Sequence, residues 1–253
     1  MTIKYSVKKD INYIISQCKN ELNSLRGKNI LFTGPGGFVG YLFTLTLSEI
    51  CKDYDISLTM VDNFIRGKME WLKNLERNEK IEIINSDISK PINYNKNFDY
   101  IIHAASIASP TFYRKHPIET IDSNVNGIRN LLELSKYQQD NSNSISGLLF
   151  FSSSEIYGDP SPDAIPTPET YKGIVSCTGP RACYDESKRL GETLCVSFYE
   201  QYNIPVKVVR PFNNYGPGLN INDRRLLPDL FNNIFRNEDI VLLSDGSATR
   251  TFC

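Results

Sequence analysis

The sequence predicts a doubly wound α/β fold, in which a parallel sheet carries helices on both faces. Three observations point to it: short apolar runs alternate with helical segments, a glycine-rich turn follows the first run, and small or polar residues follow several others. Strands that alternate with helices form a parallel sheet, because each helix is the crossover between two strands. We expect this sheet to occupy most of the chain, followed by a smaller, partial C-terminal lobe.

The expected elements follow the chain in order. An amphipathic helix is expected over residues 10–25, where apolar residues recur at helical spacing. Apolar runs then predict strands at 29–33, 57–62, 81–86, 100–105, 147–152 and 205–210, and longer periodic segments predict helices at 38–51, 117–137 and 184–202. Beyond residue 213 we expect mostly loops, one helix near 226–236 and one strand near 240–243. The chain therefore divides into a helical extension (1–27), a sheet domain (28–212) and the start of a second lobe (213–253).

Bulk composition excludes several classes of protein. The formal net charge of the 253 residues is −1, so the chain lacks the strongly positive surface that nucleic-acid binding needs. Two histidines and six cysteines without a CxxC pair offer no ligand cluster for zinc, and we expect no metal. No apolar run is long enough to span a bilayer. We expect a cytoplasmic protein with reduced thiols that binds neither membranes nor nucleic acid.

A glycine-rich turn stands between the first expected strand and the helix that follows it. Gly34, Gly37 and Gly40 are spaced as GxxGxxG. Glycines there let the backbone turn tightly and approach a pyrophosphate, whose charge is met by the amides and dipole of the helix. Asp62 ends the next strand, where an acid can accept hydrogen bonds from the adenosine ribose and repel a 2′-phosphate. The pattern predicts a Rossmann domain that binds NAD rather than NADP.

Residues at other strand ends complete the expected cofactor site. Asp87, after the third strand, is a candidate partner for the adenine amino group. Ala104 and its small neighbours end the fourth strand, which suits a backbone passing close to the cofactor. His103 is expected to be a packed, hydrogen-bonded histidine rather than a catalyst. The full set that we expect to bind NAD is Gly34, Gly36, Gly37, Phe38, Val39, Gly40, Asp62, Asn63, Asp87, Ile88, Ala104, Tyr184 and Lys188.

Tyr184 and Lys188 form a YxxxK pair on one expected helix. One helical turn separates them, so both side chains lie on the same face. An ammonium beside a phenol stabilises the phenolate, so we expect the pKa of Tyr184 to fall below about 10 and Tyr184 to act as a general base. Ser153, Ser154 and Glu155 end the preceding strand at the carboxyl edge, where open α/β sheets bind ligands. Ser153 is expected to hydrogen-bond the substrate oxygen alongside Tyr184.

Seven segments, taken together and in this order, resemble a known family: TGPGGFVG, VDNFIRGK, HAASIASPTFY, SSSEIYGDP, GPRACYDESKR, RPFNNYGP and DGSATRTF. They are similar to the extended short-chain dehydrogenases/reductases of the NAD-dependent epimerase/dehydratase family, and within it to the UDP-glucuronate decarboxylases (UDP-xylose synthases). The resemblance runs from about residue 28 to the end. The Ser-Glu after Ser153 is most like the decarboxylases, since the related 4,6-dehydratases usually carry Asp-Glu there and the 4-epimerases usually lack the acid.

The resemblance implies an NAD-dependent nucleotide-sugar lyase that acts as a homodimer. It would oxidise carbon 4 of UDP-glucuronate, release carbon dioxide and reduce the product to UDP-xylose. The implied catalytic residues are Ser153, Ser154, Glu155, Tyr184 and Lys188. Asn213, Arg225 and Arg250 match positions that hold the substrate diphosphate, for which the planar fork of arginine is well suited.

Other functions remain open at this point. A nucleotide-sugar 4,6-dehydratase or a 4-epimerase would start from the same oxidation at carbon 4 and differ afterwards. A regulatory protein that binds a dinucleotide without turnover would have no need of Ser153, Tyr184 and Lys188 together. The sequence departs from the family at 103–107 and in the helical extension, and it ends soon after Arg250, so we expect the second lobe to be partial.

Overall fold

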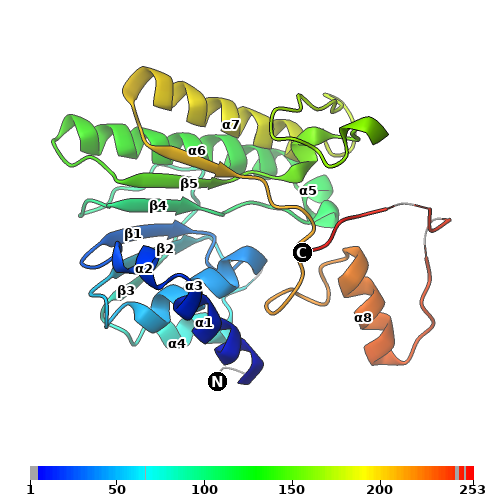
Figure 1. The fold of residues 1–253 in the computed structure, drawn as a ribbon, viewed down its shortest axis with the longest axis horizontal. Helices are drawn as coiled ribbons and strands as arrows, with labels where there is room; N and C mark the ends of the chain where they lie inside the picture. Colours follow the sequence, from blue (N-terminus) through cyan, green and yellow to red (C-terminus); the bar gives the residue numbers. More distant parts are fainter. Residues whose placement is uncertain (1–4, 66, 243–244, 248) are drawn as a thin grey trace.

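The computed structural model describes residues 5–65, 67–242, 245–247 and 249–253, and its centre is a parallel sheet (Figure 1). Within these residues the sheet has six strands in the order β3-β2-β1-β4-β5-β6. The chain starts in the middle, winds outward to β3, returns to β4 and winds outward again. The predicted doubly wound fold is therefore confirmed. The strands are β1 (Asn29–Thr33), β2 (Ser57–Asp62), β3 (Ile81–Asn85), β4 (Tyr100–His103), β5 (Gly147–Phe151) and β6 (Val206–Val209).

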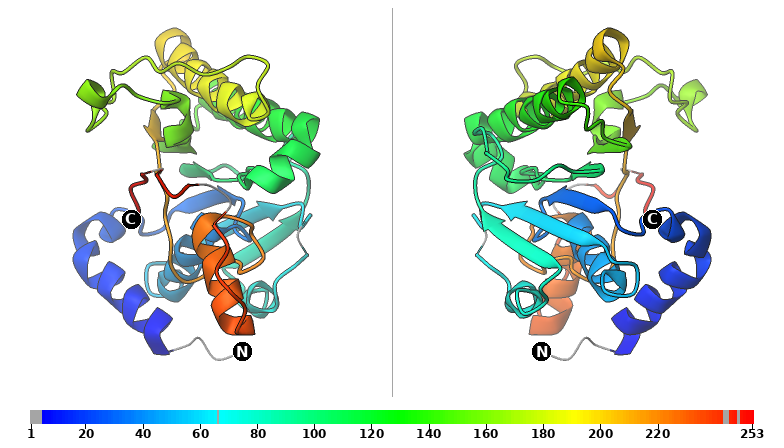
Figure 2. Two further views of the ribbon diagram at one scale, coloured as in Figure 1. Left: turned by 90° about the vertical axis from the view of Figure 1, so that its right-hand side faces the viewer. Right: turned by 90° about the vertical axis from the view of Figure 1, so that its left-hand side faces the viewer.

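Helices cover both faces of the sheet, and the residues of β1 show why. Leu31 belongs to the apolar cluster under α6 (Pro117–Asp140) and α7 (Ala182–Tyr202), whereas Ile30 and Phe32 belong to the cluster under α3 (Phe38–Ile50). Successive side chains of a strand point to opposite faces, so an apolar run without alternation needs cover on both sides. Figure 2 shows α6 and α7 on one side of the sheet and α1 and α3 on the other.

The N-terminal extension packs against the sheet domain. The expected helix over 10–25 is two helices, α1 (Tyr5–Gln17) and α2 (Lys19–Asn23), which meet at Cys18. Val7 and Ile11 of α1 are buried with Leu45 of α3. Their burial removes apolar surface of α3 from water, so the extension is tied to the domain that follows it. The division of the chain after residues 27 and 212 stays a prediction.

The remaining helices are α4 (Glu70–Leu75), α5 (Pro110–Lys115), α8 (Leu226–Arg236) and the short turns η1 (Ser154–Tyr157) and η2 (Pro162–Ala164). The helix expected near 226–236 is confirmed as α8. Four of the expected strands, 81–86, 100–105, 147–152 and 205–210, are one or two residues shorter than predicted. Each of them ends where the ladder gives way to the loops at the carboxyl edge. No helix among the described residues is long and apolar enough to cross a membrane.

The prediction of a strand near 240–243 is wrong. Residues 240–242 are not in a strand, and Leu243 lies outside the described residues. Ile240, Val241 and Leu242 are all more than half exposed. An apolar run becomes a strand only when a neighbouring strand accepts its hydrogen bonds, and in the described part of the chain these residues pair with none.

Candidate active site

The turn between β1 and α3 forms one wall of a cavity of about 440 Å³ at the carboxyl edge of the sheet. Gly34 has φ +79°, and a Cβ there would lie 2.6 Å from the backbone nitrogen of Ala105. A Cβ at Gly36 would lie 3.1 Å from Asp62 Oδ2, so a side chain would stand over that carboxylate. The absence of a side chain at Gly34 therefore makes room for the backbone of Ala104 and Ala105, and its absence at Gly36 leaves bare backbone beside Asp62, which suits close approach of a pyrophosphate.

Asp62 lies at the end of β2 and faces this cavity. Its Oδ2 accepts the N–H of Gly36 at 3.0 Å and its Oδ1 accepts the N–H of Phe64 at 2.9 Å. Burial raises the pKa of Asp62, and the two backbone hydrogen bonds oppose that shift. Each carboxylate oxygen keeps a lone pair for a ligand hydroxyl. The predicted residues that line the cavity are Gly34, Gly36, Gly37, Phe38, Val39, Gly40, Asp62, Asn63, Asp87, Ile88 and Ala104.

His103 is packed beneath the cavity, as expected. Its Nδ1 shares a 2.7 Å hydrogen bond with the hydroxyl of Thr33, and its ring stacks on Phe150 with centroids 5.7 Å apart. Burial lowers the pKa of His103 to about 3. The ring is therefore neutral at ordinary pH and does not act as a proton donor there.

A second cavity of about 600 Å³ adjoins the first and shares Phe38, Val39 and Ala104 with it. The YxxxK pair enters this cavity from α7, together with the serines and the glutamate that follow β5. One helical turn places the pair on one face of α7, and both side chains are buried. The predicted catalytic residues that meet here are Ser153, Ser154, Glu155, Tyr184 and Lys188.

Lys188 does not lower the pKa of Tyr184 in the way the sequence suggests. Its Nζ donates to the carbonyl of Phe151 at 2.7 Å and lies 5.8 Å from the centroid of the Tyr184 ring. Burial raises the pKa of Tyr184, and a hydrogen bond from Ser153 lowers it only in part. Burial also lowers the pKa of Lys188 to about 7. The expected direction was wrong because both groups are withdrawn from water, which penalises the charged form of each.

Glu155 is held by an arginine from the start of α7. Arg181 makes an ion pair with Glu155, and its Nε lies 3.5 Å from Asp185 Oδ2. Arg181 and Glu155 both line the second cavity. The pair therefore holds a carboxylate at the wall of the cavity that Tyr184 also lines, and no sequence pattern links Arg181 to Glu155, which are 26 residues apart.

Sequence reasoning missed three side chains that are linked to Tyr184. The Tyr113 ring stacks on the Tyr184 ring, with centroids 5.2 Å apart and planes at 13°. Tyr113 is 1% exposed and lines the second cavity, and its hydroxyl has no hydrogen-bond partner among the described residues. Asn124 of α6 donates to Ser187 at 2.9 Å, and the Ser187 hydroxyl donates to the carbonyl of Tyr184 at 3.0 Å. Only the packing of α5 and α6 against α7 reveals these contacts.

The three residues expected at the substrate diphosphate reach the same cavity from the C-terminal part of the chain. Asn213, Arg225 and Arg250 all line it. The amide of Asn213 donates to the carbonyl of Thr251 at 3.0 Å, which ties the loop after β6 to the end of the chain. The Arg225 Nε donates to Asp223 Oδ1 at 2.5 Å, so one of the N–H groups of its guanidinium already has a partner within the chain. Their role toward a diphosphate stays a prediction.

A parallel six-stranded sheet, a glycine-rich β1–α3 turn and a buried YxxxK pair define the class of this protein. The chain belongs to the NAD dependent epimerase/dehydratase family, which matches residues 30–253. It is similar to UDP-glucuronic acid decarboxylase 3 of Arabidopsis thaliana, with 37% identity over 88% of this chain and 62% of that protein. UDP-glucuronic acid decarboxylase 1 of Xenopus tropicalis is also 37% identical, over 89% of this chain and 50% of that protein. The chain thus spans between half and two thirds of the length of these relatives.

The fold also matches solved structures. A UDP-N-acetylglucosamine 4-epimerase from Methanobrevibacter ruminantium M1, in complex with UDP-N-acetylmuramic acid, superposes with a TM-score of 0.74. The sequences are 27% identical, and the match covers 90% of this chain and 69% of that chain.

Proposed function

We propose that the protein carrying this chain converts UDP-glucuronate to UDP-xylose and carbon dioxide with the help of NAD. The observation that carries the proposal is the meeting of Ser153, Glu155, Tyr184 and Lys188 in one cavity beside the glycine-rich turn. The similarity to UDP-glucuronic acid decarboxylases over 88% of the chain supports the choice of substrate.

The residues at the carboxyl ends of β1 and β2 fit NAD. The bare backbone at Gly34 and Gly36 would receive the pyrophosphate, together with the amides at the start of α3, a helix of 13 residues. The Asp62 carboxylate would accept hydrogen bonds from the adenosine ribose. When bound, NAD would supply an acceptor for a hydride from carbon 4 and a donor for its return.

Tyr184 is the proposed base for the oxidation. It would take the proton of the carbon 4 hydroxyl while a hydride leaves the same carbon, which gives a ketone. The Ser153 hydroxyl hydrogen-bonds Tyr184, and the charge of Arg225 also favours ionisation of the phenol, although burial opposes it. Lys188 would keep its place against the carbonyl of Phe151, with its charge beside the Tyr184 ring.

The ketone at carbon 4 stands β to the carboxylate of glucuronate, so the bond between carbons 5 and 6 can break. Carbon dioxide then leaves, and the bonding electrons form an enolate that Tyr184 and Ser153 would stabilise by hydrogen bonds. A proton must add to carbon 5, and Glu155, which Arg181 holds at the wall of the same cavity, would direct it. Return of the hydride to carbon 4, with a proton from Tyr184 to its oxygen, completes UDP-xylose.

The proposal is tested with UDP-glucuronate labelled at carbon 6. Release of labelled carbon dioxide in the presence of NAD is the expected result. Tyr184→Phe should abolish release while the dissociation constant for NAD changes little. The matched control is Tyr13→Phe, which alters an exposed tyrosine of α1 and should leave turnover unchanged. Full turnover by Tyr184→Phe would contradict the mechanism.

A 4-epimerase is the second candidate, because the solved 4-epimerase described above superposes on most of this chain. It would return a nucleotide sugar of inverted configuration at carbon 4 and release no carbon dioxide. A 4,6-dehydratase would release water instead. A regulatory protein would bind NAD and transform none of these substrates. The same incubation, analysed by mass and by chromatography, separates all four outcomes.

We further propose that two copies associate through α6 and α7. Leu190, Val196 and Tyr199 of α7 are between 46% and 56% exposed, so this helix presents apolar side chains to its surroundings. Burying such side chains between copies would stabilise a dimer. Sedimentation equilibrium gives the mass in solution, and a monomer at all concentrations would refute this association.

A further inference from the structure

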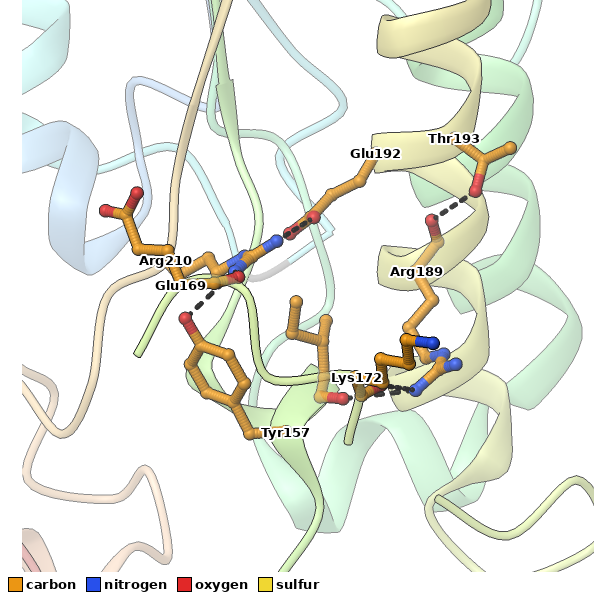
Figure 3. A network of polar contacts seen from close by, with 8 residues as sticks. Tyr157, Glu169, Lys172, Arg189, Glu192, Thr193 and Arg210 are labelled. Carbon is orange, nitrogen blue, oxygen red and sulfur yellow. Dashed lines mark hydrogen bonds and ion pairs between the residues drawn. The ribbon is translucent and has the colours of Figure 1, made fainter. Parts of the chain in front are cut away.

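Arg210 joins several parts of the chain next to the site (Figure 3). It follows β6 and makes a two-point ion pair with Glu192 of α7, with Nε–Oε1 and Nη2–Oε2 distances of 2.9 and 2.7 Å. Its Nη1 donates to the hydroxyl of Tyr157 at 2.9 Å and to the carbonyl of Glu169 at 2.7 Å. The guanidinium also lies 5.1 Å from the centroid of the Tyr157 ring. One side chain therefore holds the last residue of η1 and the loop after it against α7.

Arg189 makes a second attachment between the same elements. From α7, its Nη1 donates to the carbonyls of Ile156, Lys172 and Gly173 at 3.3, 3.1 and 3.4 Å. Arg189 lies about one turn before Glu192 on the helix. The helix that carries the YxxxK pair is thus bound to η1 at two points along its length.

The turn η1 needs such support, because it has little of its own. It is a 3-10 helix of four residues with two backbone bonds of its own, Ile156 N to Ser153 O at 3.4 Å and Gly158 N to Glu155 O at 3.1 Å. The Ser153 hydroxyl also accepts from Glu155 N at 3.3 Å, and Ser154 N donates to the carbonyl of Pro211 at 3.0 Å. Short 3-10 turns have poor hydrogen-bond geometry. The position of η1 relative to α7 therefore depends also on contacts made from outside the turn, which are the ion pair of Arg181 with Glu155 and the attachments made by Arg189 and Arg210.

We infer that Arg210 is a positioning residue, which holds η1, and with it the backbone that carries Glu155, relative to Tyr184 on α7, while Arg181 orients the Glu155 carboxylate itself. The described residues that line the two cavities do not include Arg210, so it acts through Glu192 and Tyr157 rather than on a ligand. The catalytic meaning of this anchoring rests on the proposed function, whereas the anchoring itself does not.

A double variant, Arg210→Gln with Glu192→Gln, tests the inference. The side chains of Arg210 and Glu192 are only 24% and 14% exposed, so both charges are removed together to avoid leaving one buried alone. The matched control is Lys28→Gln with Asp99→Asn, which removes a 2.9 Å ion pair of intermediate exposure at the amino-terminal edge of the sheet. Hydrogen–deuterium exchange of residues 155–158 reports the anchoring, and steady-state kinetics with UDP-glucuronate reports its effect.

The double variant should exchange faster at residues 155–158 and lose about 100-fold in kcat, the loss typical of a misplacement of about 1 Å. KM and the dissociation constant for NAD should stay within about twofold, because no residue that binds either molecule is changed. Tyr157→Phe removes only the hydroxyl that Arg210 bonds, and it should shift exchange and kcat in the same direction by less. The control pair should leave both measurements unchanged.

Unchanged exchange at residues 155–158 in the double variant would overturn the inference, whatever the activity. Faster exchange with an unchanged kcat would leave Arg210 a purely structural role and would overturn it as well. Absence of turnover in the unaltered protein would refute the proposed function, and the exchange measurement would still decide whether Arg210 anchors η1.

Discussion

Lys188 makes the stability of this protein depend on pH in a way that can be calculated. The lysine is 2% exposed, and burial lowers its pKa from 10.5 to about 7, although the charge of Glu192 acts in the opposite direction. Between these two values the unfolded chain binds a proton at this lysine that the folded protein has released. The free energy of unfolding therefore rises with pH through this window, by at most about 1.4 kcal/mol per pH unit.

The effect between pH 7 and pH 9 comes to about 2 kcal/mol, because the folded lysine is still half protonated at pH 7. Lys188→Met removes the amine and with it this rise. Urea unfolding of both proteins at pH 7, 8 and 9 measures the difference, in which all other titrating groups cancel. The control is Lys207→Met, which replaces an exposed lysine of β6.

We expect the stability advantage of Lys188→Met over the unaltered protein to shrink by about 2 kcal/mol from pH 7 to pH 9. Lys207→Met should show no such trend. If the difference between Lys188→Met and the unaltered protein were the same at the three pH values, the lysine would not be desolvated and its placement under Tyr184 would be wrong.

Three further predictions follow from named contacts. Asp62→Asn should weaken NAD binding by about tenfold and reduce the preference for NAD over NADP, because the amide carries no charge to bind the ribose hydroxyls or to repel a 2′-phosphate. Calorimetric titration with both dinucleotides measures the two dissociation constants, and an unchanged preference would contradict the assignment. Ile11→Ala should lower the free energy of unfolding by about 2 to 5 kcal/mol, because Ile11 is fully buried against the sheet domain. Urea denaturation measures this free energy, and a change below about 0.5 kcal/mol would show that α1 does not pack against the domain. Tyr113→Phe should raise the free energy of unfolding by about 1 kcal/mol, since a buried hydroxyl without a partner among the described residues is removed; urea denaturation measures it, and a loss of stability would mean that the hydroxyl is paired after all.

The sheet and the cofactor turn could be predicted from the sequence, because the information for each is contiguous. An apolar run such as 29–33, followed by closely spaced glycines and a helical segment, encodes a strand, a turn and a helix within a short stretch of chain. The YxxxK spacing likewise places Tyr184 and Lys188 on one helical face. These patterns were confirmed as structure because local geometry alone decides them.

Tertiary packing decided the rest of the site. Three contacts of the site join residues that are far apart in sequence, so no local pattern predicts them. They are the ion pair of Arg181 with Glu155, the stacking of Tyr113 on Tyr184 and the attachment of η1 by Arg210. The pKa of Tyr184 is raised instead of lowered, because desolvation depends on how completely neighbouring elements cover a group. Residues 240–242 form no strand because no strand in the described part of the chain pairs with them. Periodicity specifies which elements form, whereas burial and pairing across the chain specify the charge state and the position of each side chain in the site.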